Sequence, residues 1–262
     1  MSDSTTEAEF QTSEYLGIST TSTQQDFGPA LYPPRFGTAH SGLPVHWHQG
    51  RPLVSPIRGS RRATLWGKRA VDVGLAAAAL VVLSPILVGV AAAVRLTSPG
   101  PSLFHQQRIG FGNRPFEVLK FRTMRIDCSD PTGVAQTRAG DPRITPIGKF
   151  LRKTSIDELP QLINVLRGEM SLVGPRPHVP GMLAGGVRYE ELVPYYEHRH
   201  SVRPGITGWA QANGLRGPTD DADRAIARVD HDLAYIQNMS VALDFRIMFL
   251  TIWREFFTGS GI

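Results

Sequence analysis

The sequence has few of the residues that mark several common classes of protein. Cys128 is its single cysteine among 262 residues, so an internal disulfide is excluded and a reducing compartment is the simpler assumption. Aromatic residues make up only 8% of the chain and few are interleaved with basic residues, which argues against nucleic-acid binding. The N-terminus also lacks a basic start followed by an apolar run, so no secretory signal peptide is expected.

Residues 1–60 lack any sustained apolar period and are rich in Ser, Thr, Gln, Gly and Pro. Such a segment cannot bury enough surface to offset the entropy lost on ordering, which predicts a disordered tail, with docking of Trp47 as the alternative. This part holds three basic and five acidic residues, so the remaining residues carry a formal charge of +7. A basic body indicates an anionic partner such as nucleic acid, phospholipid or a phosphorylated metabolite.

Residues 73–94 contain no charged side chain and are long enough to enter a bilayer core. A buried core helix is the alternative, but apolarity on all faces favours a membrane segment. Ser84 and Pro85 lie in its middle, where proline removes an amide donor and bends the helix. Basic residues flank both ends, so the positive-inside rule gives no direction of crossing. We therefore expect residues 61–96 to form a basic flank and a re-entrant helix that returns to the cytoplasmic face.

Residues 97–262 are predicted to form one compact domain of the α+β class, mostly helical and with a small sheet. Two short strands are expected at 103–104 and 116–121, separated by a loop. Amphipathic stripes predict helices around 144–151 and 159–166, the second ended by Gly168. Residues 241–257 form a further apolar helix that is either part of the core or an interfacial membrane helix.

Asp157 and Glu158 form an acidic pair beside basic residues, and two readings of their position remain. Ser155 and Glu158 have the spacing of a capping box, which would make the pair purely structural. Pro160 argues against that register, since with Asp157 as the cap it falls in the first turn, where no donor is missed. The helix field would then keep Asp157 ionised next to amides suited to phosphate, as an aspartyl-phosphate nucleophile requires.

Three basic motifs point to phosphate handling. Gly174-Pro175-Arg176-Pro177 fixes the backbone around Arg176, and Arg203-Pro204-Gly205 repeats that design with a glycine that would allow a ligand to approach closely. Lys120 and Arg122 alternate with apolar residues, so both would face one side of a strand. Each motif alone also reads as a turn or solvated surface. Together with a membrane segment, they favour a phosphorylated substrate at the bilayer surface.

Four segments in this order closely resemble the bacterial sugar transferases, also called monotopic phosphoglycosyl transferases. They read KRAVDVGLAAAALVVLSPILV, FHQQRIGFGNRPFEVLKFRTM, GKFLRKTSIDELPQLINVLRGEMSLVGPRP and HRHSVRPGITGWAQANG. The resemblance covers residues 68–262. It implies transfer of a sugar 1-phosphate from a UDP-sugar to undecaprenyl phosphate, with release of UMP, as the first step of a surface polysaccharide or glycoconjugate.

The resemblance also implies roles for individual residues. Asp157 would attack the β-phosphate and form a covalent phosphosugar intermediate, while Glu158 would help to hold Mg²⁺ or position the second nucleophile. Both carboxylates are therefore expected metal ligands, and the helix would break at Ser84 and Pro85. The matching positions expected around the substrate are Lys120, Arg152, Pro175, Arg176, Pro177, Arg203 and Gly205. Asp244 matches an acid in the last helix, where Lys120 is the expected buried partner.

The resemblance predicts an enzyme at the inner membrane, with its catalytic domain on the cytoplasmic face and homo-oligomerisation left open. Two alternatives from other classes remain: a membrane-tethered basic scaffold that binds lipid, and a glycosyltransferase that releases UDP. His178, His198 and His200 suggest a metal cluster, but a basic surface is the simpler interpretation.

Overall fold

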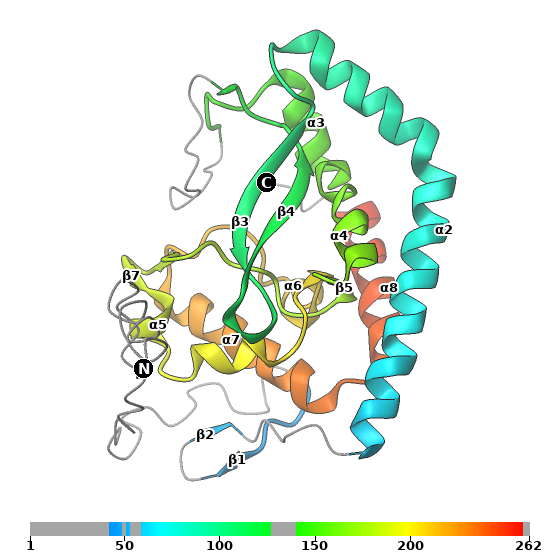
Figure 1. The fold of residues 1–262 in the computed structure, drawn as a ribbon. Helices are drawn as coiled ribbons and strands as arrows, with labels where there is room; N and C mark the ends of the chain where they lie inside the picture. The colour runs from blue at the N-terminus through cyan, green and yellow to red at the C-terminus, as the bar shows by residue number, and fades with distance from the viewer. Residues whose placement is uncertain (1–41, 49–50, 53–58, 127–139, 259–262) are drawn as a thin grey trace, which may run out of the picture. The chain divides into compact units, whose positions relative to one another are not determined.

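The computed structural model describes residues 42–48, 51–52, 59–126 and 140–258 (Figure 1). Helices hold most of these residues, and the strands of this described part form two-stranded pairs. The mostly helical α+β fold expected for the body of the chain is therefore confirmed. Cys128 lies outside the described residues.

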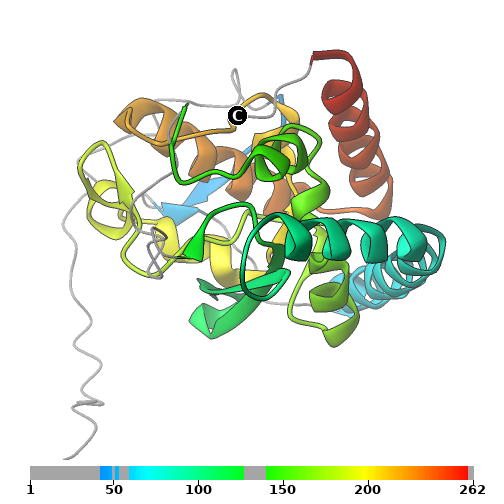
Figure 2. The ribbon, with the colours of Figure 1, turned by 90° about the horizontal axis from the view of Figure 1, so that it is seen from above.

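Helix α2, Gly59–Thr97, contains the uncharged run and is the one helix of the described residues long and apolar enough to cross a membrane, judged by length and composition. The most apolar 18-residue stretch of α2 has a mean hydropathy of 2.5, yet only 6% of that stretch is buried. Val81 and Val82 are about three-quarters exposed. The alternative of a buried core helix is therefore wrong. Pro85 lies inside α2, and Figures 1 and 2 show the helix changing direction along its length.

A β-hairpin follows α2 and carries the first site residues. Strand β3, Leu103–Ile109, pairs antiparallel with β4, Pro115–Phe121, and the 3₁₀ turn η1, Phe111–Asn113, joins them. Gly112 adopts a φ of 64° in this turn, a left-handed conformation that glycine reaches without steric cost. Both predicted strands are confirmed, although β3 extends five residues beyond its predicted end.

Helix α3, Pro146–Lys153, and helix α4, Gln161–Arg167, are the two predicted amphipathic helices. The hydroxyl of Thr145 accepts a hydrogen bond from the Gly148 amide and caps α3. Gly168 ends α4 at a φ of 84°, as predicted. Between the helices lies the 3₁₀ turn η3, Ile156–Glu158, which contains the acidic pair.

The remaining elements build the larger part of the core. Strand β5, Ser171–Val173, pairs in parallel with β8, Gly205–Thr207, and β6, Leu183–Ala184, pairs antiparallel with β7, Val187–Arg188. The other elements are α5, Tyr189–Leu192; η4, Tyr196–Ser201; α6, Trp209–Ala212; α7, Ala222–Asn238; and α8, Val241–Thr258. Helix α7 buries Val229, Leu233 and Ile236 in this core.

Helix α8 is part of the core on one face, as one of the two readings predicted, and exposes apolar side chains on the other. Leu243 and Ile247 are buried in the core. The opposite face exposes between 50 and 63% of four large apolar side chains, Phe245, Phe249, Ile252 and Trp253. Helices α2 and α8 both lie on the same side of α7, as seen from above in Figure 2.

Helix α2 is anchored to the domain by small and branched side chains. Ala76 is fully buried in one cluster with Val118 of β4 and Val165 of α4. Val94 is buried in a second cluster with Phe121 of β4 and Leu151 of α3. Helix α2 therefore packs against the three elements, β4, α3 and α4, that surround the acidic pair.

Part of the predicted tail is ordered. Strand β1, Trp47–His48, pairs with β2, Arg51–Pro52, and the Trp47 ring packs edge-on against Tyr195 at 5.0 Å. The His46 amide donates to Oε1 of Gln237 in α7 at 2.6 Å. Docking of Trp47, the alternative weighed for this segment, is what the structure shows for residues 42–48. Residues 1–41, 49–50 and 53–58 lie outside the described residues.

Candidate active site

The acidic pair lies on a turn that the chain reaches through an unusual backbone conformation. Ser155 lies between α3 and η3 at a φ of 54°, and it is one of two non-glycine residues with positive φ in the described chain. The Glu158 amide donates to the Ser155 carbonyl at 3.2 Å, which closes the 3₁₀ turn. Positive φ costs an L-residue roughly 1–2 kcal/mol and concentrates at functional sites.

Neither predicted capping arrangement is present. The Ser155 side chain makes no capping hydrogen bond, and α4 begins at Gln161 with Pro160 at its cap position. Asp157 thus lies inside a 3₁₀ turn, four residues before the start of α4, and the predicted cap at Asp157 is wrong. The proline explains this, because its missing amide is tolerated where no intrahelical bond is yet required.

Glu158 is held by two cations from distant parts of the chain. Nζ of Lys120, on β4, donates to Oε1 of Glu158 at 2.8 Å. Arg176, in the loop after β5, donates from Nη2 to the same oxygen at 2.6 Å and from Nη1 to Oε2 at 3.3 Å. Burial opposes ionisation of Glu158, but the charges of Arg176 and Lys120 outweigh it and hold its pKa well below the usual range. Glu158 is therefore a fixed, ionised carboxylate.

Asp157 has the opposite environment. Its residue surface is only 8% exposed, and no described residue forms a hydrogen bond or ion pair with its carboxylate. Burial raises the pKa of Asp157 to about 6, opposed by Lys120 and reinforced by Glu158. The sequence predicts a helix field that keeps Asp157 ionised, but Asp157 lies in a 3₁₀ turn before α4 and burial acts in the opposite direction. A pKa of about 6 still leaves the carboxylate mostly ionised at pH 7. Adjacent carboxyl groups whose pKa values are driven apart are typical of sites that divide chemical roles between them.

Further cations surround the pair. Arg152, on α3, donates from Nε to the Thr123 hydroxyl at 2.8 Å, and its charge acts on Asp157. Arg108, on β3, donates to the Pro177 carbonyl at 3.1 Å and to the Gln106 side chain. Burial, followed by the charge of Arg176, lowers the pKa of Arg108 to about 10.

Sequence reasoning treated Arg108 only as a basic flank of the membrane segment. The signal that could have found it is the sequence QQRIG, where Gln106 and Arg108 share one face of a strand. Arg216, in the loop after α6, was also missed, and its charge interacts with those of Arg176 and Glu158.

The two proline-containing loops pack directly on each other. The Gly174 amide donates to the Thr207 carbonyl and the Gly205 amide to the Pro175 carbonyl, both at 2.9 Å. A Cβ atom on Gly205 would lie 2.1 Å from the Gly174 amide nitrogen. Gly205 therefore serves contact between the loops, and the predicted close approach to a ligand is not what its surroundings show. Pro175 and Pro177 are buried on either side of Arg176, as the rigid loop required.

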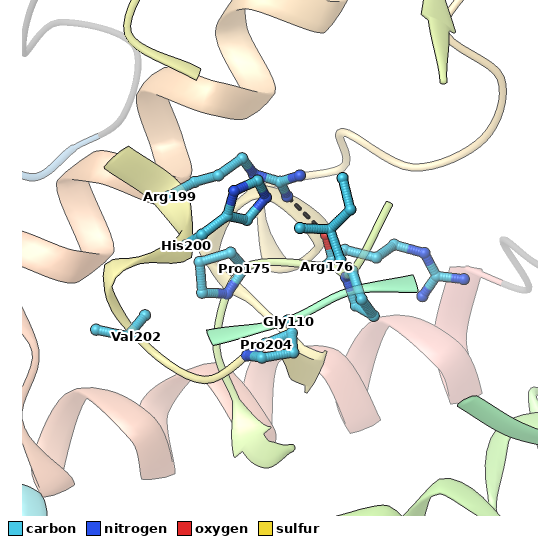
Figure 3. Close-up of a pocket in the computed structure, with 9 residues that line it drawn as sticks. Gly110, Pro175, Arg176, Arg199, His200, Val202 and Pro204 are labelled. Carbon is cyan, nitrogen blue, oxygen red and sulfur yellow. Dashed lines mark hydrogen bonds between the residues drawn. The ribbon is translucent and has the colours of Figure 1, made fainter. Parts of the chain in front are cut away.

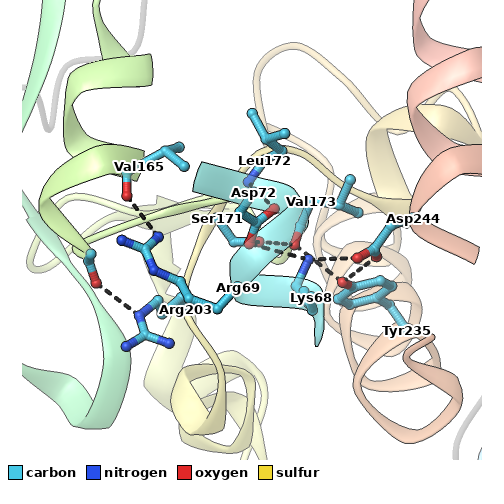
Figure 4. Close-up of polar contacts among 11 residues, drawn as sticks. Lys68, Arg69, Asp72, Val165, Ser171, Leu172, Val173, Arg203, Tyr235 and Asp244 are labelled. Carbon is cyan, nitrogen blue, oxygen red and sulfur yellow. Dashed lines mark hydrogen bonds and ion pairs between the residues drawn. The ribbon is translucent and has the colours of Figure 1, made fainter. Parts of the chain in front are cut away.

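Two basic residues of the predicted phosphate-handling motifs, Arg203 and Arg122, contact backbone carbonyls at helix ends. Arg203 donates from Nε to the Gly168 carbonyl at 2.8 Å, beside Arg69, which donates to the Val165 carbonyl at 2.7 Å (Figure 4). Both guanidinium groups thus cap the C-terminal carbonyls of α4. Arg122 donates to the Ser98 carbonyl at 2.7 Å, just after the end of α2. Lys120 donates to Glu158 instead, so the two basic residues have different acceptors.

A buried polar network joins the N-terminal part of α2 to the rest of the domain (Figure 4). Lys68 forms an ion pair of 2.7 Å with Asp244 on α8, which also accepts a hydrogen bond from Tyr235 at 2.7 Å. The predicted pairing of Asp244 with Lys120 is therefore wrong. Asp72 accepts hydrogen bonds from the Ser171 hydroxyl and the Leu172 amide of β5, at 2.8 and 3.1 Å. Strand β5, which leads into the Arg176 loop, is fixed directly to α2.

The three histidines do not form a metal cluster. Within the described residues no group of three or more histidine, cysteine or acidic side chains could hold a metal ion. His178 and His200 are buried, so the basic-surface interpretation is also wrong for them. Burial and the charge of Arg199 lower both pKa values, that of His200 to about 3. His178 instead shares a hydrogen bond of 3.0 Å with the Tyr196 hydroxyl.

Comparison with known proteins decides the family, since the family model for bacterial sugar transferases matches residues 63–258. The chain belongs to the bacterial sugar transferase family. The resemblance seen in the motifs is thereby confirmed, and this family member is an enzyme of the phosphoglycosyl transferase class.

Three relatives indicate how the family members are named. An exopolysaccharide production protein from Rhizobium leguminosarum bv. phaseoli is 55% identical over 194 residues, 74% of this chain and 97% of the relative. An undecaprenyl-phosphate glucose phosphotransferase from Komagataeibacter xylinus is 54% identical over 74% of this chain and 36% of the relative. A UDP-glucose:undecaprenyl-phosphate glucose-1-phosphate transferase from Escherichia coli (strain K12) is 48% identical over 84% of this chain. The matched part of the chain covers 47% of the Escherichia coli protein and 36% of the Komagataeibacter protein. It covers nearly all of the Rhizobium protein.

Proposed function

We propose that this chain transfers a sugar 1-phosphate from a UDP-sugar to undecaprenyl phosphate, through a covalent intermediate on Asp157. The observation that carries the proposal is the asymmetry of the acidic pair. Within the described residues the buried Asp157 carboxylate has no hydrogen-bond or ion-pair partner, while Lys120 and Arg176 occupy its neighbour Glu158. A group without partners is available as a nucleophile, and a group held by cations serves to position them.

In the first step an Asp157 oxygen attacks the β-phosphorus of the donor. The new bond joins that oxygen to phosphorus, and the bond from the β-phosphorus to the bridging oxygen breaks, so UMP leaves with the electron pair. An oxygen of undecaprenyl phosphate then attacks the same phosphorus, and the Asp157 carboxylate is released. Two displacements in one site predict ping-pong kinetics.

Cations around the pair would stabilise the negative charge of the diphosphate. Lys120 and Arg176 are fixed by Glu158, and the Arg176 side chain remains 43% exposed, so part of its guanidinium faces outward. Arg152 and Arg108 add positive charge from α3 and β3. Fixed cations lower the barrier because they need no reorganisation as the transition state forms.

The carboxylates also fit a Mg²⁺ ion. The Asp157 carboxylate has no described partner, and Oε2 of Glu158 has only the long contact of 3.3 Å with Arg176, so oxygen lone pairs remain. Mg²⁺ binds through one or two carboxylates together with substrate phosphates. When bound, it would neutralise charge on the diphosphate.

We place the enzyme at the inner membrane, with α2 as a re-entrant helix and the site on the cytoplasmic face. Exposed apolar side chains on α2 support insertion, and basic residues on both sides of it support return to one face. The exposed face of α8 carries Phe249 and Trp253, whose rings lie 6.1 Å apart. Aromatic side chains of this kind favour the headgroup region of a bilayer.

UDP-glucose is the proposed donor, because two close relatives are named for glucose phosphate transfer. The test uses the full chain in nanodiscs with Mg²⁺, undecaprenyl phosphate and either UDP-glucose or UDP-N-acetylgalactosamine. Acceptor-dependent UMP release from UDP-glucose supports the proposal. Release of UDP would instead indicate transfer of the sugar alone, and release of neither nucleotide would favour the scaffold alternative.

A further inference from the structure

A fully buried ion pair lies directly behind Arg176. Arg199, in η4, and Asp232, in α7, have side chains only 1% and 4% exposed. The guanidinium of Arg199 donates from Nη2 and Nε to Oδ2 of Asp232, at 2.7 and 3.0 Å. The same Nη2 donates to the backbone carbonyl of Arg176 at 2.6 Å, the bond drawn in Figure 3.

Such a pair is not explained by stability. Taking two charges out of water is unfavourable, and well-packed apolar residues in their place are often equally or more stabilising. The charge of Arg199 is compensated by Asp232 and by the Tyr196 ring, 5.3 Å away. What an apolar pair could not supply is a donor for the Arg176 carbonyl.

That carbonyl belongs to Arg176, whose side chain donates hydrogen bonds to Glu158. Gly174 and Pro175 tie the loop to β8 before Arg176, and Arg199 ties it at Arg176 itself. Pro175, Pro177 and Arg199 line one small pocket beside Arg176 (Figure 3). The outer side carries the Arg176 guanidinium toward Glu158.

We propose that Arg199, oriented by Asp232, is a positioning residue that fixes the backbone of Arg176 and so aims its guanidinium at Glu158 and the donor diphosphate. This rests on the proposed function. The planar fork of Arg199 bonds the carboxylate and the carbonyl at once, whereas the compact ammonium of a lysine has no rigid fork. Errors of about 1 Å in the placement of a charged group can cost about 100-fold in rate.

The test compares Arg199→Lys and Asp232→Asn with a matched control, Asp230→Asn, in the full chain in nanodiscs. Asp230 lies on the same helix and is equally buried, but its partner is the Tyr195 hydroxyl at 2.7 Å, away from Arg176. Melting temperature, kcat and KM for UDP-glucose are measured for each. We expect Arg199→Lys and Asp232→Asn to lower kcat/KM by about 10- to 100-fold. Asp230→Asn should leave kcat/KM unchanged, even if its melting temperature falls as much as that of Asp232→Asn.

A double-mutant cycle separates positioning from general damage. If Arg199 acts through Arg176, then Arg199→Lys in an Arg176→Ala background lowers kcat/KM by less than about twofold more. The inference would be overturned if the double variant lost kcat/KM by the product of the two single losses. It would also be overturned if Asp230→Asn lowered kcat/KM as much as Asp232→Asn. If Arg199→Lys does not fold, Asp232→Asn takes its place in the cycle.

Failure of the proposed function is distinguishable. An active wild type with unimpaired Arg199→Lys and Asp232→Asn variants overturns the inference alone. A wild type that releases no UMP from any UDP-sugar overturns the proposed function, and the inference with it.

Discussion

The hydroxyl of Ser84 donates to the carbonyl of Val81 at 2.8 Å, and this carbonyl is the acceptor that Pro85 leaves without an amide donor. In an α-helix the amide of residue 85 would bond to the carbonyl of residue 81, but proline has no N–H. The Ser84 hydroxyl thus donates to the Val81 carbonyl that Pro85 leaves without an amide donor. In a bilayer such compensation matters because no water replaces the missing donor.

Ser84→Ala is therefore expected to destabilise the protein in nanodiscs by about 1–2 kcal/mol, the cost of an unsatisfied carbonyl. Pro85→Ala supplies the missing amide, so the same serine change in a Pro85→Ala background should cost little. Ser84→Thr, which keeps the hydroxyl, is the matched control. Thermal unfolding in nanodiscs measures each step, and an equal cost of Ser84→Ala in both backgrounds would contradict this account.

The pH dependence of activity should follow Asp157. Its pKa is raised to about 6, so the nucleophilic carboxylate is lost as the pH falls through 6, rather than near 4 as for an exposed carboxyl. The free-enzyme profile of kcat/KM should show this acid limb. An acid limb near pH 4 would mean that Asp157 is not shielded from water as described.

Stability should change in the opposite direction. A carboxyl whose pKa is higher in the folded than in the unfolded protein binds protons more tightly when folded, so its contribution to stability grows as the pH falls from 7 toward 4. In Asp157→Asn this contribution disappears. Denaturant unfolding of both proteins at pH 7 and pH 5 tests the point, and an identical pH response would refute it.

Gly205 should not tolerate a side chain. A Cβ atom there would meet the Gly174 amide nitrogen at 2.1 Å and force the two loops apart. Gly205→Ala is expected to destabilise the protein by about 1–3 kcal/mol and to lower kcat/KM through displacement of Arg176. Gly67→Ala is the control, since no atom lies within 4 Å of its added Cβ. Equal unfolding temperatures for both variants would show that the loops do not need this contact.

The Lys68 and Asp244 pair should be strongly coupled. Lys68→Met leaves the Asp244 carboxylate buried without its cation and should destabilise the protein by about 3–5 kcal/mol. Adding Asp244→Asn should recover part of that loss. Lys149→Met, on the exposed side of α3, should change the free energy of unfolding by less than about 0.5 kcal/mol. Additive effects of the two buried changes would contradict the pairing.

Local patterns were sufficient for the elements near the site. Alternation predicted the strands around Lys120, the apolar stripes predicted α3 and α4, and Gly168 marked the end of α4. The motif containing Asp157 and Glu158 identified the acidic pair without its geometry. The left-handed Ser155 has no sequence signal, because serine rarely adopts that conformation.

Partners far apart in the chain could not be predicted in the same way. Lys68 and Asp244 are separated by 176 positions, and Arg203 by 35 from the carbonyl that it caps. Which cation reaches which acid depends on how helices pack, and residue type carries no such information. Arg203 and Lys120 looked equivalent in sequence, yet one caps a helix and the other binds Glu158.

The covalent step on Asp157 is the central claim, and one measurement tests it most directly. The protein in nanodiscs is incubated with Mg²⁺ and UDP-glucose without undecaprenyl phosphate, quenched in acid, digested and analysed by mass spectrometry. We predict a hexose phosphate on the peptide containing Asp157, absent from Asp157→Asn and discharged when undecaprenyl phosphate is added. UMP release that requires the acceptor, with no adduct on any peptide, would mean direct transfer in one displacement and would contradict the account.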